Sequence, residues 1–176
     1  LAAAPFLFKD KIKSMIAKAI NEQVDANVAF DDVSLSLFKS FPQANVTVDK
    51  LSIINKAPFE GDTLVYMREL NLKMSVKELF KGEGEAMNVE SLSTKDGLVN
   101  ILFNKNGVGN FDIAIKDDKA TPGGEESKPF ALNMQNYTVE NLRFKYFDER
   151  SKVRMVIDSI NHQGIGNFAQ SKLDLD

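Results

Sequence analysis

The feature that most constrains this chain is a recurring eight-position pattern: apolar, any residue, apolar, polar, polar, apolar, any residue, apolar. Six stretches follow it, although the last position is polar in the fourth and the sixth. They are Val28–Leu35, Val46–Ile53, Val65–Leu72, Met87–Thr94, Tyr137–Phe144 and Met155–His162. Each half of the pattern alternates with a period of two, which places the apolar side chains of a β-strand on one face.

The two polar positions in the middle of the pattern decide how its halves connect. The extra residue turns the second half to the opposite face of a regular strand, unless a β-bulge restores the apolar face. A two-residue hairpin turn is the alternative, but such turns prefer Asn-Gly or Asp-Gly, and no copy has glycine there. We therefore predict bent strands, interrupted but not reversed at Asp49-Lys50, Glu90-Ser91, Glu140-Asn141 and their equivalents.

The segments outside the copies predict other elements. Apolar side chains at three- and four-residue spacing predict an amphipathic helix over Phe6–Gln23, about 27 Å long at 1.5 Å per residue. Val76–Phe80 predicts one helical turn, closed by Gly82, and the polar residues 116–130 predict a mobile loop inserted into one sheet. The turn signals are Pro42, Pro58 with Gly61, Asp96-Gly97 and Asn106-Gly107.

The six copies, two strands around Asn106-Gly107 and the alternating Lys172–Asp176 give about nine strands. The predicted fold is mostly β: an N-terminal helix followed by a strongly curled, largely antiparallel sheet that forms an open groove. We expect one domain over 1–176, with the helix at 6–23, a first β block at 27–115, the loop at 116–130 and a continuing β block at 131–176. The apolar start at Leu1 and the interrupted alternation at the end favour the N-terminal piece of a longer protein.

The apolar face of such a sheet needs a cover. About nine strands at ~4.8 Å spacing make a sheet ~40 Å wide, whereas one helix is about 10 Å across. The apolar face must therefore curl on itself, meet another sheet or a partner, or hold an apolar ligand. An exposed apolar surface of that size is typical of an interaction site.

Composition excludes several classes of function. The chain has no cysteine and a single histidine, His162, which excludes disulfides, thiolate metal sites and a cage of several imidazoles. A net charge of −3 argues against a nucleic-acid binder. The sequence also contains no run of about 20 apolar residues, the length that a membrane-spanning helix needs. Phosphate-binding loops and nucleophile motifs are absent, and the paired acids, such as Asp31-Asp32, are interpreted as solvated charge. We expect no catalytic residue, no cofactor and no metal, and hence a protein that is not an enzyme.

A series of segments, taken in order, carries a resemblance to a known family. An apolar lead runs into the helix Phe6–Gln23, and Asn106–Asp112 contains a Gly-x-x-Asn-aromatic segment. Between them come Val33–Phe38, Val48–Ile53, Pro58-Phe59, Leu70–Val76 and Leu79–Gly82. Over Leu1–Ala114 the chain resembles the N-terminal region of the AsmA family of bacterial envelope proteins, and Gln135–Asn161 is similar to its continuing repeat. Phe111 stands where that family usually has tryptophan.

The resemblance implies a location and a function. It implies a periplasmic protein anchored in the bacterial inner membrane by a segment that precedes Leu1. It also implies a repeating β-groove related to the bridge-like lipid carriers of the chorein type, and a role in phospholipid transport or outer-membrane biogenesis. The implied partners are phospholipid or another acyl-chain lipid and the inner membrane, with protein partners unknown and nucleic acid excluded.

We expect the residues after the bends to line the groove, because their apolar side chains share one face. The lining candidates are Val33, Leu35, Leu51, Ile53, Leu70, Leu72, Leu142 and Phe144. The alternative is a structural or protein-interaction β module of the cell envelope, in which the apolar face pairs with another sheet or subunit and carries no lipid.

Overall fold

The computed structural model describes residues 24–37, 42–81, 87–113 and 132–166. Within these ranges the chain forms seven strands in one open sheet and one short 3-10 helix, which confirms the mostly β prediction. The strands are β1 (Ala26–Ala29), β2 (Asp32–Ser36), β3 (Gln43–Asn55), β4 (Thr63–Ser75), β5 (Met87–Phe103), β6 (Leu132–Asp148) and β7 (Val153–Ile165). The predicted helix Phe6–Gln23, the loop at 116–130 and the stub Lys172–Asp176 lie outside the described residues.

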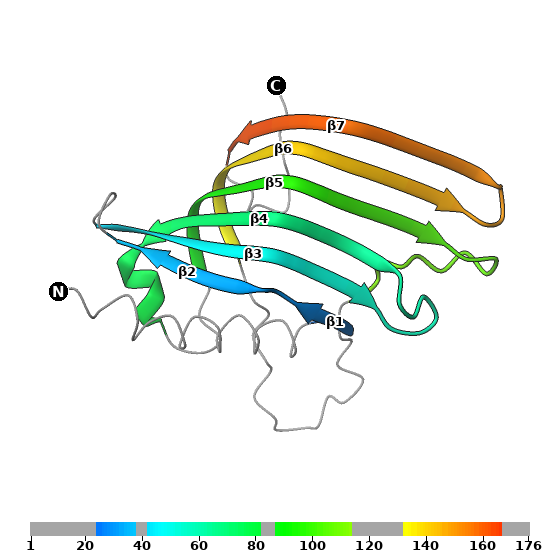
Figure 1. Cartoon of the computed structure of the whole chain (residues 1–176), viewed down its shortest axis with the longest axis horizontal. Coiled ribbons are helices and arrows are strands. Elements are labelled where there is room, and N and C mark those ends of the chain that lie inside the picture. The colour runs from blue at the N-terminus through cyan, green and yellow to red at the C-terminus, as the bar shows by residue number, and fades with distance from the viewer. Residues whose placement is uncertain (1–23, 38–41, 82–86, 114–131, 167–176) are drawn as a thin grey trace.

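The strands follow the chain order across the sheet, and all bend in the same sense, so that the sheet forms an arch (Figure 1). The order is β1-β3-β4-β5-β6-β7, and β2 continues the edge beside β3. Every pair is antiparallel except β5 and β6, which run parallel with Met87 opposite Leu132 and Phe103 opposite Asp148. Strands from both predicted β blocks therefore belong to one sheet. No helix in the described ranges has the length and hydropathy needed to cross a bilayer.

The bends lie side by side across the sheet, along a line that we call the crease. It consists of Asp31, Lys50, Arg68, Asp96, Asn141 and Ser159, of which Ser159 is offset because it falls between the β7 partners of Leu142 and Phe144. Lys50, Asp96 and Asn141 each have φ of 52° and Ser159 has φ of 57°, a left-handed conformation that inserts one extra residue into a strand that otherwise continues. The pairs on either side remain aligned, for example Asp49 with Glu69 and Leu51 with Met67. The predicted interruptions at Asp49-Lys50 and Glu140-Asn141 are thus confirmed.

Polar side chains connect neighbouring strands along the crease. Lys50 Nζ lies 2.6 Å from Asp31 Oδ2, and Arg68 Nη2 lies 2.6 Å from Asp96 Oδ2. The Asn141 amide donates to Asp96 Oδ1 at 2.6 Å, and the Asn141 backbone N–H donates to Asn161 Oδ1 at 2.9 Å. The hydrogen bond and the charge of Asp31 raise the pKa of Lys50 above its ordinary value. These contacts connect β3 to the break between β1 and β2, β4 to β5, β5 to β6, and β6 to β7.

The hydrophobic core occupies one face of the sheet on the β2 side of the crease. Its buried members are Val33, Ala44, Val46, Val48, Met74, Leu79 and Val89. They come from β2, β3, β4, β5 and η1 (Val76–Phe80), the single helical turn that the sequence predicts. Ser75 caps this turn by accepting a hydrogen bond from the Lys77 N–H. The helical turn thus closes the end of the core at which β4 finishes.

The expectation of about nine strands is not supported, because seven are described. The first copy of the pattern forms the two short strands β1 and β2 rather than one strand. The segment after Asn106-Gly107 makes a single bridge, Phe103 with Gly109, instead of a strand. The Asn110 N–H still donates to the Leu102 carbonyl, but the Leu102 N–H donates to the Asn110 side chain instead of to a backbone carbonyl, so the ladder stops there.

The bends of β5 were predicted only in part. As predicted, the strand continues through Glu90-Ser91 without reversing, and Glu90 is left out of its pairing with β6. A further bend at the left-handed Asp96 was not predicted, and Asp96-Gly97, expected to mark a turn, does not reverse the chain. Aspartate tolerates a positive φ, so Asp-Gly serves equally for a turn and for a bulge. Pairing with strands on both sides selects the bulge here, because Lys95 and Gly97 are each paired with β4 and with β6.

Candidate functional site

The main candidate surface is the apolar face of the sheet, which consists of four rows of side chains that cross the strands. The strand register aligns the residues within each row. On one side of the crease the rows are Leu35-Val46-Leu72-Leu92-Tyr137-Gly164 and Val33-Val48-Leu70-Thr94-Val139-His162. On the other side they are Leu51-Met67-Gly97-Leu142-Ile160 and Val28-Ile53-Val65-Val99-Phe144-Ile157. The apolar face therefore continues through the bend and reaches both edges of the sheet.

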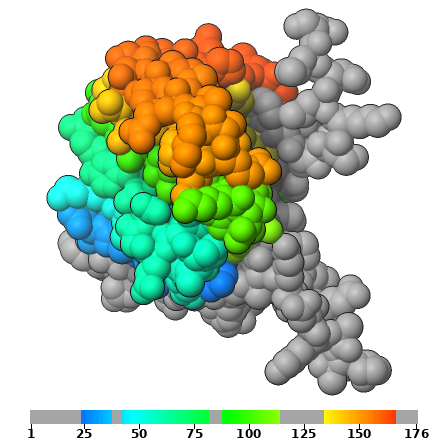
Figure 2. Space-filling model, turned by 90° about the vertical axis from the view of Figure 1, so that its right-hand side faces the viewer, coloured from blue at the N-terminus to red at the C-terminus, as the bar shows by residue number. Residues whose placement is uncertain are grey.

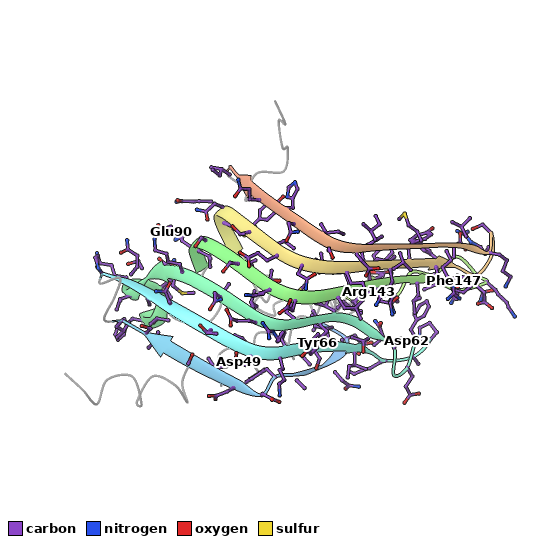
Figure 3. The ribbon with its side chains drawn as sticks, turned by 45° about the horizontal axis from the view of Figure 1, so that its top comes forward. Asp49, Asp62, Tyr66, Glu90, Arg143 and Phe147 are labelled. Carbon is purple, nitrogen blue, oxygen red and sulfur yellow. The ribbon has the colours of Figure 1, made fainter. Side chains whose placement is uncertain are left out.

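The opposite face carries the charges, because every second residue of each strand points there. Asp49, Glu90 and Arg143 lie on the outer, convex side of the arch (Figure 3). Ion pairs join the strands on this side, including Lys73 with Glu90 at 2.7 Å and Arg143 with Asp158 at 2.9 Å. The apolar face is therefore the concave side of the arch.

Polar side chains within the four rows are few and already have partners. Among these described residues they are Thr94, Tyr137 and His162. Thr94 Oγ1 lies 3.0 Å from Met67 Sδ, and the Tyr137 hydroxyl lies 2.9 Å from His162 Nδ1. The Tyr137 and His162 rings are stacked with centroids 5.5 Å apart. His162 occupies an apolar position of the pattern and hydrogen-bonds to Tyr137, but it is exposed rather than half-buried.

The middle of the apolar face is shaped by Gly97. A Cβ atom at this position would lie 2.5 Å from Met67 Sδ and 2.8 Å from Leu142 Cδ1, so both side chains reach over the glycine. Gly164 has the same relation to Tyr137, whose ring would lie 2.4 Å from a Cβ there. Glycine at these two positions leaves room for larger side chains from the neighbouring strands to lie flat on the sheet.

Seven of the eight predicted lining residues are half-buried, and the eighth is sealed. Leu51, Ile53, Leu70, Leu72, Leu35, Leu142 and Phe144 keep part of their surface exposed. Val33 is 0% exposed and belongs to the packed core, because β3 and the core residues around it enclose its side chain. The strand register places the seven in the four rows, Leu35 and Leu72 in the first and Ile53 and Phe144 in the last.

A cavity of about 820 Å³ lies at the end of the sheet where β4 finishes and β5 begins. Its described lining includes Gln43, Glu78, Val89, Glu90, Met134 and Ile165. Glu78 accepts hydrogen bonds from the Asn88 backbone N–H at 2.9 Å and pairs with Lys81 at 2.6 Å. Burial opposes ionisation of Glu78, but these contacts outweigh it, so the pKa of Glu78 lies below its ordinary value. A fixed negative charge thus stands at this end of the sheet.

The other end is held by a buried asparagine pair. The Asn55 amide donates to the Asn110 backbone carbonyl at 2.7 Å, and the Asn110 amide donates to Asn55 Oδ1 and to the Asn100 carbonyl. Asn110 is the asparagine of the Gly-x-x-Asn-aromatic segment, so this segment ties the loop after β5 to the end of β3. The following Phe111 packs edge-to-face on Phe103 with centroids 5.5 Å apart.

Some parts of this surface escaped sequence reasoning. Met67 belongs to the third copy of the pattern and Gly97 is interpreted as part of a turn, so nothing in the sequence indicates that the Met67 side chain covers Gly97. Glu78 lies in a charged helical turn, and the sequence alone does not distinguish a buried glutamate from a solvent-exposed one at such a position. The pairing of Tyr137 with His162 depends on the β6–β7 register, and two offset bulges set that register.

Comparison of the chain with protein-family models, with curated proteins and with solved structures found no match.

Proposed function

We propose that this protein is a non-enzymatic lipid-binding module whose concave apolar face takes the acyl chains of a phospholipid or similar lipid. The observation that carries the proposal is the bent apolar face itself. It consists of four continuous rows in which polar side chains are rare, and most of its side chains remain half-exposed although charges cover the opposite face.

The energetic basis is the partition of apolar groups out of water. Each CH₂ group that moves from water onto an apolar surface gains roughly 0.8 kcal/mol, and an acyl chain carries many such groups. A face that is open along its length lets the headgroup stay in water while the chain is buried. A lipid would then move along the face without losing the hydration of its polar end.

The resemblance to the AsmA family supports a specific setting for this activity. In that setting the protein lies in the periplasm, is held at the bacterial inner membrane by a segment that precedes Leu1, and contributes to phospholipid transport or outer-membrane biogenesis. The Gly-x-x-Asn-aromatic segment is one of the segments that carry the resemblance, and its asparagine, Asn110, ties the loop after β5 to β3.

A second candidate is a structural β module of the envelope that carries no lipid. The observation in its favour is the sealed half of the face, in which Val33, Val46 and Val48 are at most 2% exposed. If the whole concave face were sealed by protein in the same way, no acyl chain could enter it.

Native mass spectrometry of the gently purified protein distinguishes the two functions. The lipid-binding module is expected to retain phospholipid, and the Leu51→Asp and Leu142→Asp variants are expected to lose it while staying folded. Ser93→Asp is the matched control, because Ser93 lies between Leu92 and Thr94 on β5 and therefore faces the convex side. If the unsubstituted protein carries no lipid after purification, and none after incubation with phospholipid at any protein-to-lipid ratio, the result would contradict lipid binding and favour the structural module.

A further inference from the structure

The two edges of the sheet differ sharply. One edge is divided into the short strands β1 and β2, and the ion pair of Asp31 with Lys50 lies at the break between them. The Asp25 N–H, just before β1, donates to the Ile113 carbonyl. Short, interrupted and charged edges are how proteins prevent unwanted strand pairing. This edge is therefore closed to further strands.

The other edge is β7, a continuous strand of 13 residues. Val153, Met155, Val156 and Ile157 are 43–52% exposed, so apolar side chains project on both of its faces. In the space-filling view the orange and red atoms of β7 form the upper margin of the molecule (Figure 2). Among the described residues no strand pairs with its outer side. A long, exposed and apolar edge is a template for pairing with another strand.

The sequence of β7 is complementary to itself. A two-fold axis perpendicular to a sheet pairs an edge strand with its own copy only in registers that place one residue opposite itself. With Val156 on the axis, Arg154 of one copy lies opposite Asp158 of the other, twice. Met155 then lies opposite Ile157, and Val153 opposite Ser159. Shifting the axis by one residue to Met155 puts Arg154 opposite Val156, and Asp158 then faces Lys152, which lies in the turn outside the strand.

The surrounding structure favours this register. The turn at Lys152, with φ of 58°, and the bulge at Ser159 bound the regular part of β7, and Val153 and Ser159 are the two ends of the self-paired stretch. The Arg154 guanidinium lies 5.0 Å from the centre of the Phe147 ring, which holds it at the strand. Asp158 already pairs with Arg143 and is 60% exposed, so it has room for a second guanidinium.

We propose that β7 pairs antiparallel with β7 of a second copy of this chain, about a two-fold axis at Val156. Because the axis is perpendicular to the sheet, the concave apolar faces of the two copies join on the same side. The paired copies then form one sheet whose apolar face is twice as wide. This inference does not depend on whether the face binds lipid.

A cysteine on the axis tests the register directly, because the chain has no cysteine of its own. Opposed Cα atoms of an antiparallel pair are about 4.5–5.5 Å apart, within the range of a disulfide. The Val156→Cys variant is therefore expected to form disulfide-linked dimers under mild oxidation. Val153→Cys is the matched control: it is similarly exposed, yet its two copies would lie about 20 Å apart at ~3.4 Å per residue.

Charge exchange tests the same pairing without a covalent bond. The mass measured by sedimentation or light scattering over a range of concentrations is expected to be that of a dimer. Arg154→Glu and Asp158→Lys are each expected to weaken the dimer at least tenfold, and the double variant to restore most of the loss. A monomer at every concentration, or a Val156→Cys variant that crosslinks no faster than Val153→Cys, would overturn the proposal. Thermal unfolding of each variant shows whether the fold is retained.

Discussion

Asp96 and Asn141 stand opposite each other in the parallel pair of strands, both with φ of 52°, and the Asn141 amide donates to the Asp96 carboxylate at 2.6 Å. A left-handed residue costs about 1 kcal/mol unless it is glycine, or a residue such as asparagine or aspartate whose side chain hydrogen-bonds locally. At Asp96 and Asn141 the crease therefore combines residues that tolerate the conformation with side chains that connect the strands.

Substitution of Asn141 separates these two contributions. Asn141→Ala keeps the strained conformation and loses the hydrogen bond, so we expect it to lower the free energy of unfolding by about 1–2 kcal/mol. Asn141→Gly loses the same hydrogen bond but relieves the backbone, so we expect a loss of less than about 0.5 kcal/mol. Urea denaturation measures both values. Equal losses for the two variants would show that the hydrogen bond, and not the conformation, is what matters.

Gly97 and Leu142 are expected to be energetically coupled. Gly97→Ala places a Cβ against the ends of the Met67 and Leu142 side chains, which can shift, so we expect a loss of about 1 kcal/mol. Leu142→Ala removes a half-buried leucine and costs about 2 kcal/mol. Because the shortened side chain makes room for the new methyl group, the double variant is expected to lose less than the sum. Strict additivity in chemical denaturation would contradict the contact over Gly97.

A carboxylate placed on the apolar face is expected to destabilise the protein strongly within the sealed core and only weakly where the face is half-exposed. Val33→Asp buries an unpaired charge at a position with no exposed surface, which costs several kcal/mol and is expected to abolish folding. Leu51→Asp places the same group where it reaches water, so we expect a loss of about 1–2 kcal/mol and a folded protein. Far-ultraviolet circular dichroism on heating distinguishes the two. Similar melting temperatures would mean that the face has no sealed half.

The ionised Glu78 carboxylate is expected to make stability depend on pH. Because the folded-state pKa of Glu78 is lowered, its contribution is fully present above the ordinary glutamate pKa of about 4.3 and is lost as the pH falls through the lower folded-state pKa. Glu78→Gln removes this dependence and is expected to cost about 1–3 kcal/mol at neutral pH. The difference in unfolding free energy between the two proteins should shrink below pH 4.3. A constant difference across that range would rule out the proposed contribution.

The sequence predicts much of this sheet because its signal is local. Two polar positions such as Asp49-Lys50 between alternating halves can preserve an apolar face only through an inserted residue, and that reasoning needs no knowledge of the neighbouring strand. The exact bend in β5 could not be predicted in this way. Asp96-Gly97 is compatible with a turn and with a bulge, and only pairing with β4 and β6 decides between them.

The lining of the apolar face was predictable as a set and not residue by residue. Leu51 and Val33 occupy equivalent positions after the bends of their copies, yet one remains half-exposed and the other is sealed. The difference arises from what packs against each position in three dimensions. The charge at Glu78 was missed because it depends on hydrogen bonds from Asn88, which lies on the next strand, β5, and approaches Glu78 only when the sheet has formed.

The crease has a consequence for how the strands find their alignment. Alternation of apolar and polar residues penalises a slip by one residue, because such a slip turns every side chain to the wrong face, but a slip by two residues preserves the faces. If a strand slipped by two residues, its left-handed residue would move away from the bend of the neighbouring strand. A bent segment of one strand would then lie opposite a straight segment of the other, and the two could not pair regularly. The crease from Lys50 to Ser159 therefore disfavours a slip by two residues, which the alternation of apolar and polar residues does not penalise.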